Sequence, residues 1–437
     1  MATRKKNTPS LGGDDRVAIV AAVRTPFVKA WAEFKDYNEA DLTRFAVNEL
    51  LNRVSLDPRV IDECIVGCVS APMNGPNVAR EVVLRSQLPR EIPAYTVQMY
   101  CASSGLAAVN GVGDILTGVA DTVLVGGVES MSSAQARFTL SLTHALNDAS
   151  KARTVPDRLK AFAEVKLKDL KPDVPSIAEP TTGKSMGDSA EDMAKHYKVS
   201  RADQDQWSLT THHRAAKAHA DGKFPELVSV NAGPKFDTIV DRDTLVRGDT
   251  TLEKMAKLRP VFDRRHGTVT AANASPLTDG ASALLLMRES KAKALGLKPM
   301  AYIKSHAIAA LDLTKYEMLL GPTFATPKAL SRAGLTLKDM GLVEMHEAFA
   351  AQVLANAKIW GDKKLCGDLG LDTIGEVDME RLNVNGGSIP IGHPFGATGA
   401  RLLMQLAGEM ERRDLKYGLA TACAAGGLGF SMVLERD

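Results

Sequence analysis

The sequence predicts an α/β fold whose parallel strands are buried on both faces. Two observations predict it: short runs rich in β-branched residues alternate with helical patterns, and the same alternation recurs in the second half of the chain. The length is a third observation. With 437 residues the chain exceeds the size at which one hydrophobic core stops growing, so we expect two or three cores.

The first half reads as strand, helix, strand, strand, helix and strand. An apolar run predicts the first strand at 16–23. The helix at 39–54 is predicted because apolar side chains recur at helical spacing, at Leu42, Phe45, Ala46, Leu50 and Leu51. The remaining elements are strands at 64–69 and 95–99, a helix of small residues at 103–118 and a strongly apolar strand at 122–128.

The second half has a similar series of elements. We expect strands at 301–308, 342–345 and 429–434 and helices at 326–333 and 347–359. Residues 95–130 and 382–434 share one outline: a strand, a turn, a helix of small residues and a strand flanked by glycine. Two related α/β halves are therefore expected.

The composition changes between the two halves. From about residue 132 to 264 the charge rises and the strand signals fade, as in an inserted lid or cap. We expect a flexible N-terminal segment (1–15), an N-terminal half (16–131 plus 265–297), an inserted loop or cap domain (132–264) and a C-terminal half (298–437).

The insertion contains a basic segment at 151–171, with seven basic residues against three acidic ones. Its side chains Leu159, Phe162, Ala163, Lys166 and Leu170 share a helical face. The pattern predicts either a basic amphipathic segment that lies on a membrane surface or a partner, or a solvated surface helix. Both interpretations stay open.

The composition excludes several classes of protein. Hydrophobic residues make up 45% and charged residues 24%, as in soluble globular proteins, which excludes disordered, collagen-like and coiled-coil chains. A net charge of +2 over 437 residues gives no excess of positive charge of the kind that attracts nucleic acid. The uncharged stretches 92–113 and 417–434 are long enough to cross a bilayer, but their polar and glycine residues indicate buried strand and turn.

The N-terminal residues and the cysteines bear on the compartment. The stretch MATRKKNTPSLGGDD lacks the apolar core of a secretory signal, so we expect a cytoplasmic protein, with an organellar presequence and a mitochondrial location as the alternative. The five cysteines form no CxxC pair, which favours reduced thiols over a disulfide framework or a zinc site.

Cys101 is the first candidate for chemistry. It stands in MYCASSG, between a predicted strand and the first turn of a helix of small residues. There the positive end of the helix dipole and unpaired amides favour the thiolate, which is the nucleophilic form. A buried structural cysteine is the alternative.

His393 is the second candidate. It stands in the glycine-rich loop GHPFGATG, where the backbone turns tightly or a ligand approaches closely. A histidine there suits a general base, because its ordinary pKa lies near working pH. A loop histidine bonded to the backbone is the alternative.

Two further motifs follow predicted strands. Cys423 begins CAAGG, whose small residues leave room for a substrate and expose amides for an oxyanion hole. In HEAF, His346 can donate a hydrogen bond, and Glu347 can orient a neighbour or cap the helix. HEAFAAQ lacks the second histidine of a HEXXH zinc site, and no Walker A, GxGxxG or GxSxG motif follows a strand.

These motifs together resemble the thiolase family over nearly the whole chain. The matching stretches, in family order, are RTPF, VQMYCASSGLAAV, VLVGGVESMS, MGDSAEDMA, KLRPVFDRRHGTVTAANASPLTDGAS, HEAF, NVNGGSIPIGHPFGATGARL and TACAAGGLGFSMVLE. The resemblance implies two related α/β halves in a five-layered αβαβα core, with an inserted loop domain that carries much of the coenzyme A site.

The resemblance also implies catalytic roles. Cys101 matches the nucleophile that attacks the C3 carbonyl of a 3-oxoacyl-CoA, and His393 matches the base that activates it. Cys423 matches the acid/base that moves a proton to and from the α-carbon of acetyl-CoA. The amides of Cys101 and Ala425 would hold the tetrahedral oxygen, and His346 with His393 would polarise the thioester oxygen of the enolate.

Four positions match residues that line coenzyme A in the family: Ser275, Met186, Arg247 and Phe349. Arg247 is the candidate for a phosphate contact, and a surface ion pair is its alternative. Coenzyme A enters as a substrate, and neither a metal nor a redox cofactor is implied.

Two departures from the family pattern bear on specificity. Many thiolases have NEAF and CxGGG where this chain has HEAF and CAAGG, so His346 adds a titratable ring. HEAF, the length and the basic segment resemble the β-subunit of the fatty-acid oxidation trifunctional complex. Ser185 stands where short-chain biosynthetic thiolases often carry histidine. We therefore expect a preference for medium or long 3-ketoacyl chains.

The expected function is that of a 3-ketoacyl-CoA thiolase (acetyl-CoA C-acyltransferase) of fatty-acid β-oxidation, which releases acetyl-CoA and a shortened acyl-CoA. The alternatives are a short-chain acetoacetyl-CoA thiolase (acetyl-CoA acetyltransferase) and a non-catalytic acyl-CoA-binding scaffold subunit. The resemblance further implies a homodimeric core and pairing with a hydratase/dehydrogenase α-subunit.

Overall fold

The computed structural model describes residues 15–172, 178–179 and 181–437. Contacts divide the chain into a larger unit, Met1–Ser133 with Glu179–Asp437, and a smaller unit, Ala134–Ala178. The flexible segment predicted at 1–15 lies outside the described residues apart from Asp15. The smaller unit falls within the insertion predicted at 132–264, whose limits stay a prediction.

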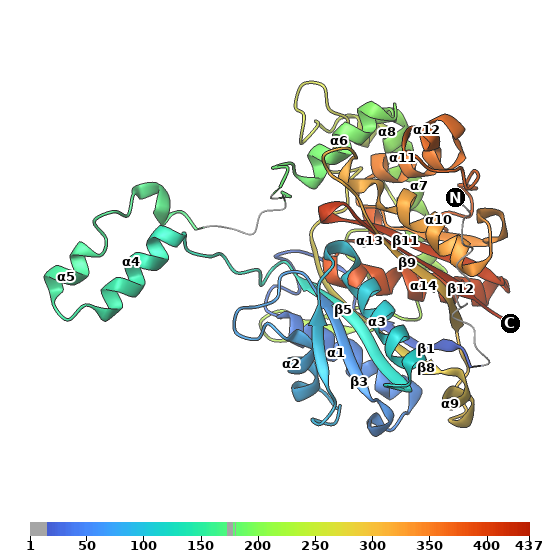
Figure 1. The fold of residues 1–437 in the computed structure, drawn as a ribbon, viewed down its shortest axis with the longest axis horizontal. Helices are drawn as coiled ribbons and strands as arrows, with labels where there is room; N and C mark the ends of the chain where they lie inside the picture. The colour runs from blue at the N-terminus through green and yellow to red at the C-terminus, as the bar shows by residue number, and fades with distance from the viewer. Residues whose placement is uncertain (1–14, 173–177, 180) are drawn as a thin grey trace, which may run out of the picture. The chain divides into compact units, whose positions relative to one another are not determined.

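Among the described residues, a ten-stranded sheet forms the centre of the larger unit (Figure 1). Its strands lie in the order β10-β11-β12-β9-β1-β8-β5-β3-β4, and β2 pairs with β8. Their bounds are β1 Val17–Arg24, β2 Val28–Lys29, β3 Glu63–Cys68, β4 Ala94–Val97, β5 Thr122–Ser130, β8 Thr278–Arg288, β9 Ala301–Ala310, β10 Leu342–Met345, β11 Tyr417–Ala424 and β12 Leu428–Glu435.

The sheet is mixed, so the prediction of parallel strands is only partly right. β3 pairs in parallel with β4 and β5, and β10 pairs in parallel with β11. The neighbours of β1, β8, β9 and β12 are antiparallel to them. The tight turn Ala425–Gly427 joins β11 to β12, and so short a connection can link only antiparallel strands.

A short joint connects the two halves of the sheet. β1 and β9 share only the pairs Ala18↔Tyr302 and Ile19↔Ala301. On one side of this joint lie the strands of the N-terminal half, and on the other side lie β9 to β12. The two α/β halves predicted from the repeated outline are therefore present, with their sheets fused at one corner.

The helices that surround the sheet have the following bounds: α1 Glu39–Val54, α2 Val78–Arg85, α3 Ser103–Thr117, α6 Met186–His196, α7 Arg201–Ala220, α8 Leu252–Ala256, α9 Glu289–Ala294, α10 Gly321–Ala333, α11 Ala350–Gly361, α12 Lys363–Asp368, α13 Ser388–Ile391 and α14 Thr398–Arg413. A separate two-stranded ribbon is formed by β6 Val230–Ala232 and β7 Thr238–Val240.

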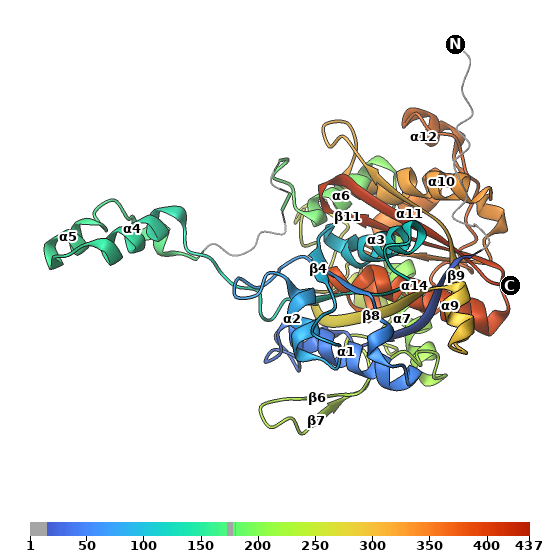
Figure 2. The ribbon, with the colours of Figure 1, turned by 60° about the horizontal axis from the view of Figure 1, so that its bottom comes forward.

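The larger unit has the five predicted layers. α3 and α14 contact each other and pack between the two halves of the sheet, whereas α1 and α2 cover one outer face and α10 and α11 the other. Figure 2 shows α1 and α2 at the bottom, α3 and α14 in the middle and α10 and α11 at the top. Alternate side chains of β1 point to opposite faces of the sheet, so Ile19 packs with the central helices and Ala18 packs with α1.

The secondary structure confirms most of the predicted elements, and α1 has the predicted bounds. Three predictions were wrong. α10 begins at Gly321 rather than 326, because Pro322 lies in the first turn, where no amide donor is needed. α11 begins at Ala350 rather than 347, because Phe349 is extended and the carbonyl of Ala348 accepts from the amide of Ser275 instead of from a helical amide. No strand begins at 382, where Leu382 forms a single bridge to Val343.

The smaller unit consists of short helices: α4 Leu140–Lys151, α5 Val155–Lys160 and the 3₁₀ turn Leu167–Leu170. The side chains of Thr139 and Thr154 cap α4 and α5. The basic segment 151–171 is therefore not one amphipathic helix, because the extended Ala152 ends α4 and turns separate α5 from Leu167. Large apolar side chains are nevertheless exposed here, at Phe138, Leu140, Val155, Leu159, Leu167 and Leu170.

Within the described part of the chain, no helix has both the length and the hydropathy needed to cross a bilayer. The two uncharged stretches form β4, the turn Tyr100–Ala102 and most of α3 in one case and β11 with β12 in the other. The prediction of buried strand and turn is right for the second stretch, whereas half of the first stretch is α-helix.

Candidate active site

Cys101 lies in a strained turn at the end of β4. The 3₁₀ turn Tyr100–Ala102 precedes α3, and Tyr100 has a left-handed φ of +47°. Ser103 Oγ accepts a hydrogen bond from the Met99 amide (2.9 Å) and donates one to the Tyr100 carbonyl (2.6 Å). The turn therefore places a buried thiol, 7% exposed, at the N-terminal end of α3, as predicted.

Two histidine rings lie beside this thiol. His346 follows β10, and His393 lies in the loop between α13 and α14, where Gly392 has a φ of +112°. Their ring centroids are 4.0 Å apart. A ligand atom from each ring and the Cys101 sulfur all lie within 4.8 Å of one another. The structure thus brings together three of the residues that were predicted from separate motifs.

Each ring uses its Nδ1 atom for a hydrogen bond to a hydroxyl. His393 Nδ1 lies 2.7 Å from Thr398 Oγ1, and His346 Nδ1 lies 2.8 Å from Ser388 Oγ. Neither Nε2 atom has a hydrogen-bond partner among the described residues, although both are buried. The two Nε2 atoms are therefore free for a substrate.

Cys423 completes the cluster from the other half of the sheet. It lies near the end of β11, is fully buried and is close enough to Cys101 for the two thiols to interact electrostatically. The backbone amides of Ala425 and Cys101 lie close enough to the Cys101 sulfur to lower its pKa. These are the two amides predicted for an oxyanion hole, and they converge on the reactive atom.

Burial controls the protonation of the cluster. It raises the pKa of the Cys101 thiol to about 12, and the two nearby backbone amides offset only part of this rise. Burial and the nearby Arg401 charge lower the pKa of His393 to about 3. Burial likewise lowers the pKa of His346 and raises that of Cys423 well beyond their usual ranges. The resting site therefore holds neutral thiols and neutral imidazoles.

Two electrostatic predictions are corrected by these values. The helix dipole was expected to favour a Cys101 thiolate, and His393 was expected to titrate near working pH. Burial instead raises the pKa of the Cys101 thiol and lowers the pKa of His393, because the desolvation of a charged group in this site outweighs the favourable effect of the two nearby backbone amides.

Glu347 was predicted to orient a neighbour or to cap a helix. The cap is wrong, because the N-cap residue of α11 is Phe349 and it makes no side-chain cap. The buried Glu347 carboxylate instead accepts hydrogen bonds from Thr211 (3.0 Å), Asn383 (2.7 Å) and the amide of Ile389 (3.2 Å). It therefore ties the end of β10 to α7 and to α13.

The four predicted coenzyme A residues lie on different elements. Met186 begins α6 and packs in the same apolar cluster as Phe349 and Cys423. The Ser275 amide donates to the carbonyl of Ala348, which places it next to HEAF. Arg247 has an exposed side chain, and its amide donates to His212 Nδ1 (3.2 Å). Their contact with coenzyme A stays a prediction.

Sequence reasoning missed the residues that hold the histidines. Ser388, Thr398 and Arg401 stand in NVNGGSIPIGHPFGATGARL, but no spacing rule connects them to a particular ring nitrogen. Glu129 was also missed, and its carboxylate binds the amide of Gly396 in the His393 loop. The available signal was a hydroxyl five residues before His393 and another five residues after it.

The Cys101 sulfur and the two histidine nitrogens are atoms of the kinds that also bind zinc in proteins.

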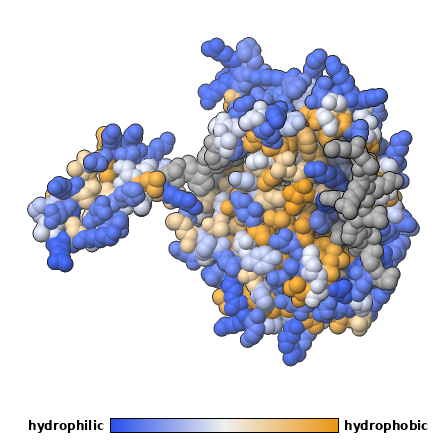
Figure 3. All heavy atoms as spheres, viewed as in Figure 1, coloured by the Kyte–Doolittle hydropathy of each residue, from blue (hydrophilic) through white to orange (hydrophobic). Residues whose placement is uncertain are grey.

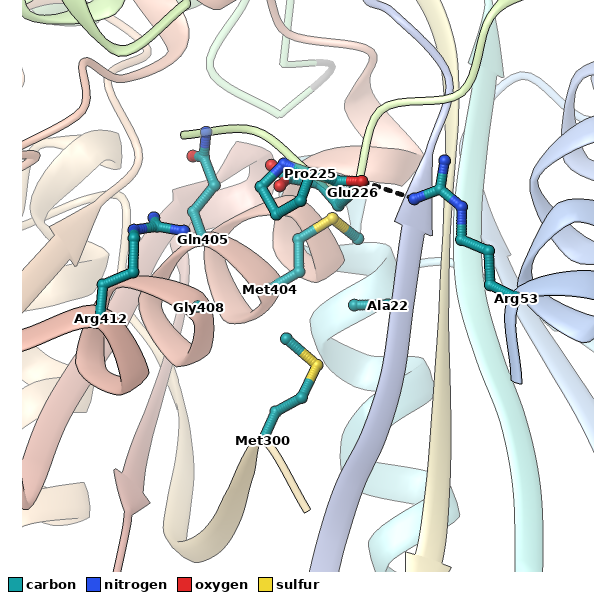
Figure 4. A pocket seen from close by; sticks show the side chains of 9 residues that line it. All are labelled: Ala22, Arg53, Pro225, Glu226, Met300, Met404, Gln405, Gly408 and Arg412. Carbon is teal, nitrogen blue, oxygen red and sulfur yellow. Dashed lines mark hydrogen bonds between the residues drawn. The ribbon is translucent and has the colours of Figure 1, made fainter. Parts of the chain in front are cut away.

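A pocket lies elsewhere, lined by Arg53, Pro225, Met300, Met404 and Arg412 among others (Figure 4). Arg53 donates there to the Pro225 carbonyl. The cluster of Cys101, His346, His393 and Cys423 contributes nothing to its lining.

Comparison with known proteins identifies the family. Residues 17–290 match the thiolase N-terminal domain and residues 297–436 match the thiolase C-terminal domain. A Shewanella pealeana protein named 3-ketoacyl-CoA thiolase is 48% identical over 437 residues, covering 100% of both chains. A Colwellia psychrerythraea protein with the same name is 47% identical over 438 residues, again covering 100% of both chains.

Two solved structures extend this comparison. The human mitochondrial 3-ketoacyl-CoA thiolase in complex with CoA has a TM-score of 0.82 and 33% identity, covering 97% of this chain and 98% of that one. The Bacillus anthracis acetyl-CoA acetyltransferase has a TM-score of 0.83 and 32% identity, covering 96% and 98%. The predicted resemblance, fold class and acyltransferase activity are confirmed. The chain belongs to the thiolase family.

Proposed function

We propose that this thiolase cleaves 3-ketoacyl-CoA into acetyl-CoA and an acyl-CoA shortened by two carbons. The observation that carries the proposal is the buried cluster in which the Cys101 sulfur and one nitrogen from each of His346 and His393 lie within 4.8 Å, with Cys423 beside them. The names of the full-length relatives agree with this function.

Cys101 and His393 perform the first step. As the Cys101 sulfur attacks C3 of the substrate, its proton passes to His393 Nε2, the carbonyl π bond opens and an oxyanion forms. The amides of Cys101 and Ala425, which converge on this sulfur, stabilise that oxygen. Because both groups are neutral at rest, proton transfer accompanies the attack rather than preceding it.

Cys423 performs the carbon acid–base step. When the C2–C3 bond breaks, the acyl group stays on Cys101 and the enolate of acetyl-CoA takes the proton of Cys423. His346 Nε2 stabilises the enolate oxygen. A buried thiol suits this task, because it stays neutral until the carbanion forms next to it.

The second half-reaction restores the enzyme. Coenzyme A gives its thiol proton to the Cys423 thiolate and attacks the acyl-thioester on Cys101. Cys101 leaves as a thiolate and takes the proton from His393. The protons balance over the cycle, and the chemistry calls on thiols, imidazoles and amides alone, so we propose that no resident cofactor or metal takes part. Met186, Phe349, Ser275 and Arg247 are the proposed contacts for coenzyme A.

The substrate is proposed to be a medium or long chain. HEAF and the basic segment support this choice, and a short-chain acetyl-CoA acetyltransferase is the alternative, since a protein with that name is as similar in fold. The intact cluster argues against the scaffold alternative. Thiolysis rates measured from acetoacetyl-CoA to 3-ketohexadecanoyl-CoA separate these cases, and a preference for acetoacetyl-CoA would contradict the proposal.

The covalent step has its own test. Incubation with 3-ketoacyl-CoA in the absence of free coenzyme A should add one acyl group to the protein, and peptide mapping should place it on Cys101. The Cys101→Ser variant should show neither the adduct nor measurable thiolysis. An unmodified Cys101 peptide in turnover-competent wild-type protein would contradict the mechanism.

A homodimeric core is also proposed. β4 lies at the end of the sheet order and its side chains are half-buried, so its free edge offers pairing to a second copy. Leu106, Val109 and Leu116 on α3 are also only partly buried, and Figure 3 shows apolar surface gathered around α3. Sedimentation that found a monomer at micromolar concentration would contradict the dimer.

The remaining partners and the location are proposals of the same kind. The smaller unit exposes apolar side chains next to basic ones, which supports contact with an anionic membrane surface or with a hydratase/dehydrogenase α-subunit. We also propose a cytoplasmic location, because the curated relatives named above are Shewanella and Colwellia proteins. These relatives give no support to the mitochondrial alternative.

A further inference from the structure

His346 and His393 lie side by side in the same buried site, but the atoms behind them differ. Behind His393 Nδ1 is Thr398, whose hydroxyl also lies 3.0 Å from the carbonyl oxygen of Pro394. Behind His346 Nδ1 is Ser388, whose hydroxyl also lies 2.6 Å from Arg401 Nη2. One hydroxyl therefore meets an acceptor, and the other meets a donor.

The acceptor determines the tautomer of His393. A carbonyl oxygen can only accept, so the Thr398 hydroxyl gives its hydrogen to Pro394. The Thr398 oxygen then accepts from His393 Nδ1–H. The single proton of the neutral ring therefore lies on Nδ1, and His393 Nε2 presents a lone pair to the site, as a base must.

The donor determines the opposite tautomer of His346. Arginine can only donate, so the Ser388 oxygen accepts from Arg401, and the Ser388 hydrogen is left to bond His346 Nδ1. His346 Nδ1 is then the acceptor, and its proton sits on Nε2. The reverse arrangement would direct two donors at Ser388 Oγ and leave the serine hydrogen without an acceptor among the described neighbours of that oxygen.

Arg401 is itself held in place. Its side chain is fully buried, donates to Gln405 Oε1 (2.7 Å) and lies 3.8 Å from a carboxylate oxygen of Glu344. Arg401 lies on α14 and Ser388 lies on α13, so two helices on either side of the His393 loop hold the chain of hydrogen bonds from Arg401 through Ser388 to His346.

We propose that Ser388, oriented by Arg401, is a positioning residue that fixes His346 as an Nε2–H donor, so that two adjacent neutral histidines act as one donor and one base. The proposal rests on the roles given above to His346 and His393. Without Ser388 and Arg401, the proton of His346 would move to Nδ1, and the Nε2 lone pair of this ring would face the developing enolate oxygen. Loss of an oxyanion-hole donor commonly slows kcat by 10²–10³-fold.

The nitrogen chemical shifts of the wild-type protein give the direct test. In protein labelled with ¹⁵N-histidine, the His346 signals should show a protonated Nε2 and a bare Nδ1, and the His393 signals should show the reverse. The His346→Asn and His393→Asn variants assign the signals. The same tautomer on both rings would overturn the proposal, whatever the variants do.

Kinetics give the second test. Ser388→Ala should lower kcat for thiolysis by about 10-fold or more with little change in KM, because the lost interaction acts on the transition state. In the His346→Asn background, where an amide donor needs no tautomer, the same substitution should change kcat less than threefold. An equal loss in both backgrounds would show a merely structural role and overturn the proposal.

A matched control is Ser305→Ala. This buried hydroxyl donates to the Ala329 carbonyl (2.7 Å), away from the histidines, and its loss should leave kcat unchanged. Acyl-enzyme formation on Cys101 in the wild-type protein separates the two levels of inference. If that adduct fails to form, the proposed function falls; if it forms and both rings share a tautomer, only the role of Ser388 falls.

Discussion

The amide of Gly396 donates a hydrogen bond to the carboxylate of Glu129, with 3.0 Å between the heavy atoms. The same carboxylate accepts from the amides of Val69 (3.2 Å) and Ser70 (2.7 Å). One buried acid therefore joins β5, the residues after β3 and the loop that carries His393. The position of the catalytic base depends on this joint, although Glu129 touches no reacting atom.

We expect Gly396→Ala to disturb this joint. A Cβ atom at Gly396 would lie 2.2 Å from the Val128 carbonyl oxygen and 2.6 Å from that of Gly67, so the His393 loop must move. Overpacking of this kind costs about 1–3 kcal/mol of folding free energy, and kcat should fall at least 10-fold. Gly408→Ala on α14 is the control, since its Cβ would meet only the end of Arg412 at 3.6 Å. Equal activity in the two variants would contradict the prediction.

The free energy of unfolding should also depend on pH through the titration of Glu129. Burial raises the pKa of this carboxyl to about 7, above the ordinary value of 4.5 that it regains on unfolding. Between these two values the folded state holds more protons, so this group's contribution to the free energy of unfolding falls as pH rises from about 4.5 to 7.

Glu129→Gln removes that dependence. Urea unfolding midpoints measured at pH 5 and pH 8 should drop between the two pH values by more in the wild-type protein than in the variant. The amide should also lower kcat, because its NH₂ group faces backbone amides that need an acceptor. Parallel pH dependences of the two proteins would contradict the assignment.

The reactivity of Cys101 toward alkylating agents should report its neutral state. With a pKa raised to about 12 by burial, the thiolate fraction grows tenfold for each pH unit over the accessible range. The rate of iodoacetamide modification of the Cys101 peptide should therefore rise steadily from pH 7 to 10. A plateau below pH 9 would show that a stabilised thiolate exists at rest.

The strands and helices of the two halves could be predicted because their signals are local. The run at 16–23 is apolar at every position after Arg16, residues 123–128 of β5 have no polar side chain, and α1 has caps and periodicity of its own. β8 lacked such a signal: Thr278, Asp279, Gly280 and Ser282 make its first half polar, and its burial comes from β1 and β5 on either side.

The site was predictable in its residues and not in its electrostatics. Cys101, His346, His393 and Cys423 stand at ends of strands or in glycine loops, and the resemblance of their motifs to the thiolase family singles them out. The pKa of each depends on how completely the two halves exclude water. The tautomers depend on hydroxyls that tertiary folding brings to each ring, so neither property has a signature in the sequence.

The division of labour between the two thiols gives a further prediction. Cys423→Ala should remove the group that exchanges a proton with the α-carbon, so the exchange of acetyl-CoA methyl protons with deuterated water should fall below detection by NMR. Acylation of Cys101 by a saturated acyl-CoA moves no proton to or from carbon and loses only the proton that Cys423 gives to the departing coenzyme A thiolate, so it should slow but stay measurable. Cys366→Ala is the matched control. Cys366 lies on α12, and its buried thiol donates a hydrogen bond to the carbonyl of Ile359, so its loss should leave both reactions intact. Exchange that survives in Cys423→Ala would place the carbon acid–base elsewhere.

The basic segment of the smaller unit should govern any membrane affinity. Lys151, Lys160, Lys168 and Lys171 have exposed side chains, and a lysine near an anionic surface contributes about 1 kcal/mol. Replacing all four by Gln should weaken co-sedimentation with phosphatidylserine vesicles at least tenfold, whereas thiolysis should not change, because the four lysines belong to the smaller unit and the cluster around Cys101 belongs to the larger one. Four exposed lysines of the larger unit, Lys328, Lys338, Lys363 and Lys364, replaced in the same way form the control. Failure of the wild-type protein to bind these vesicles would exclude the membrane and leave a protein partner for this surface.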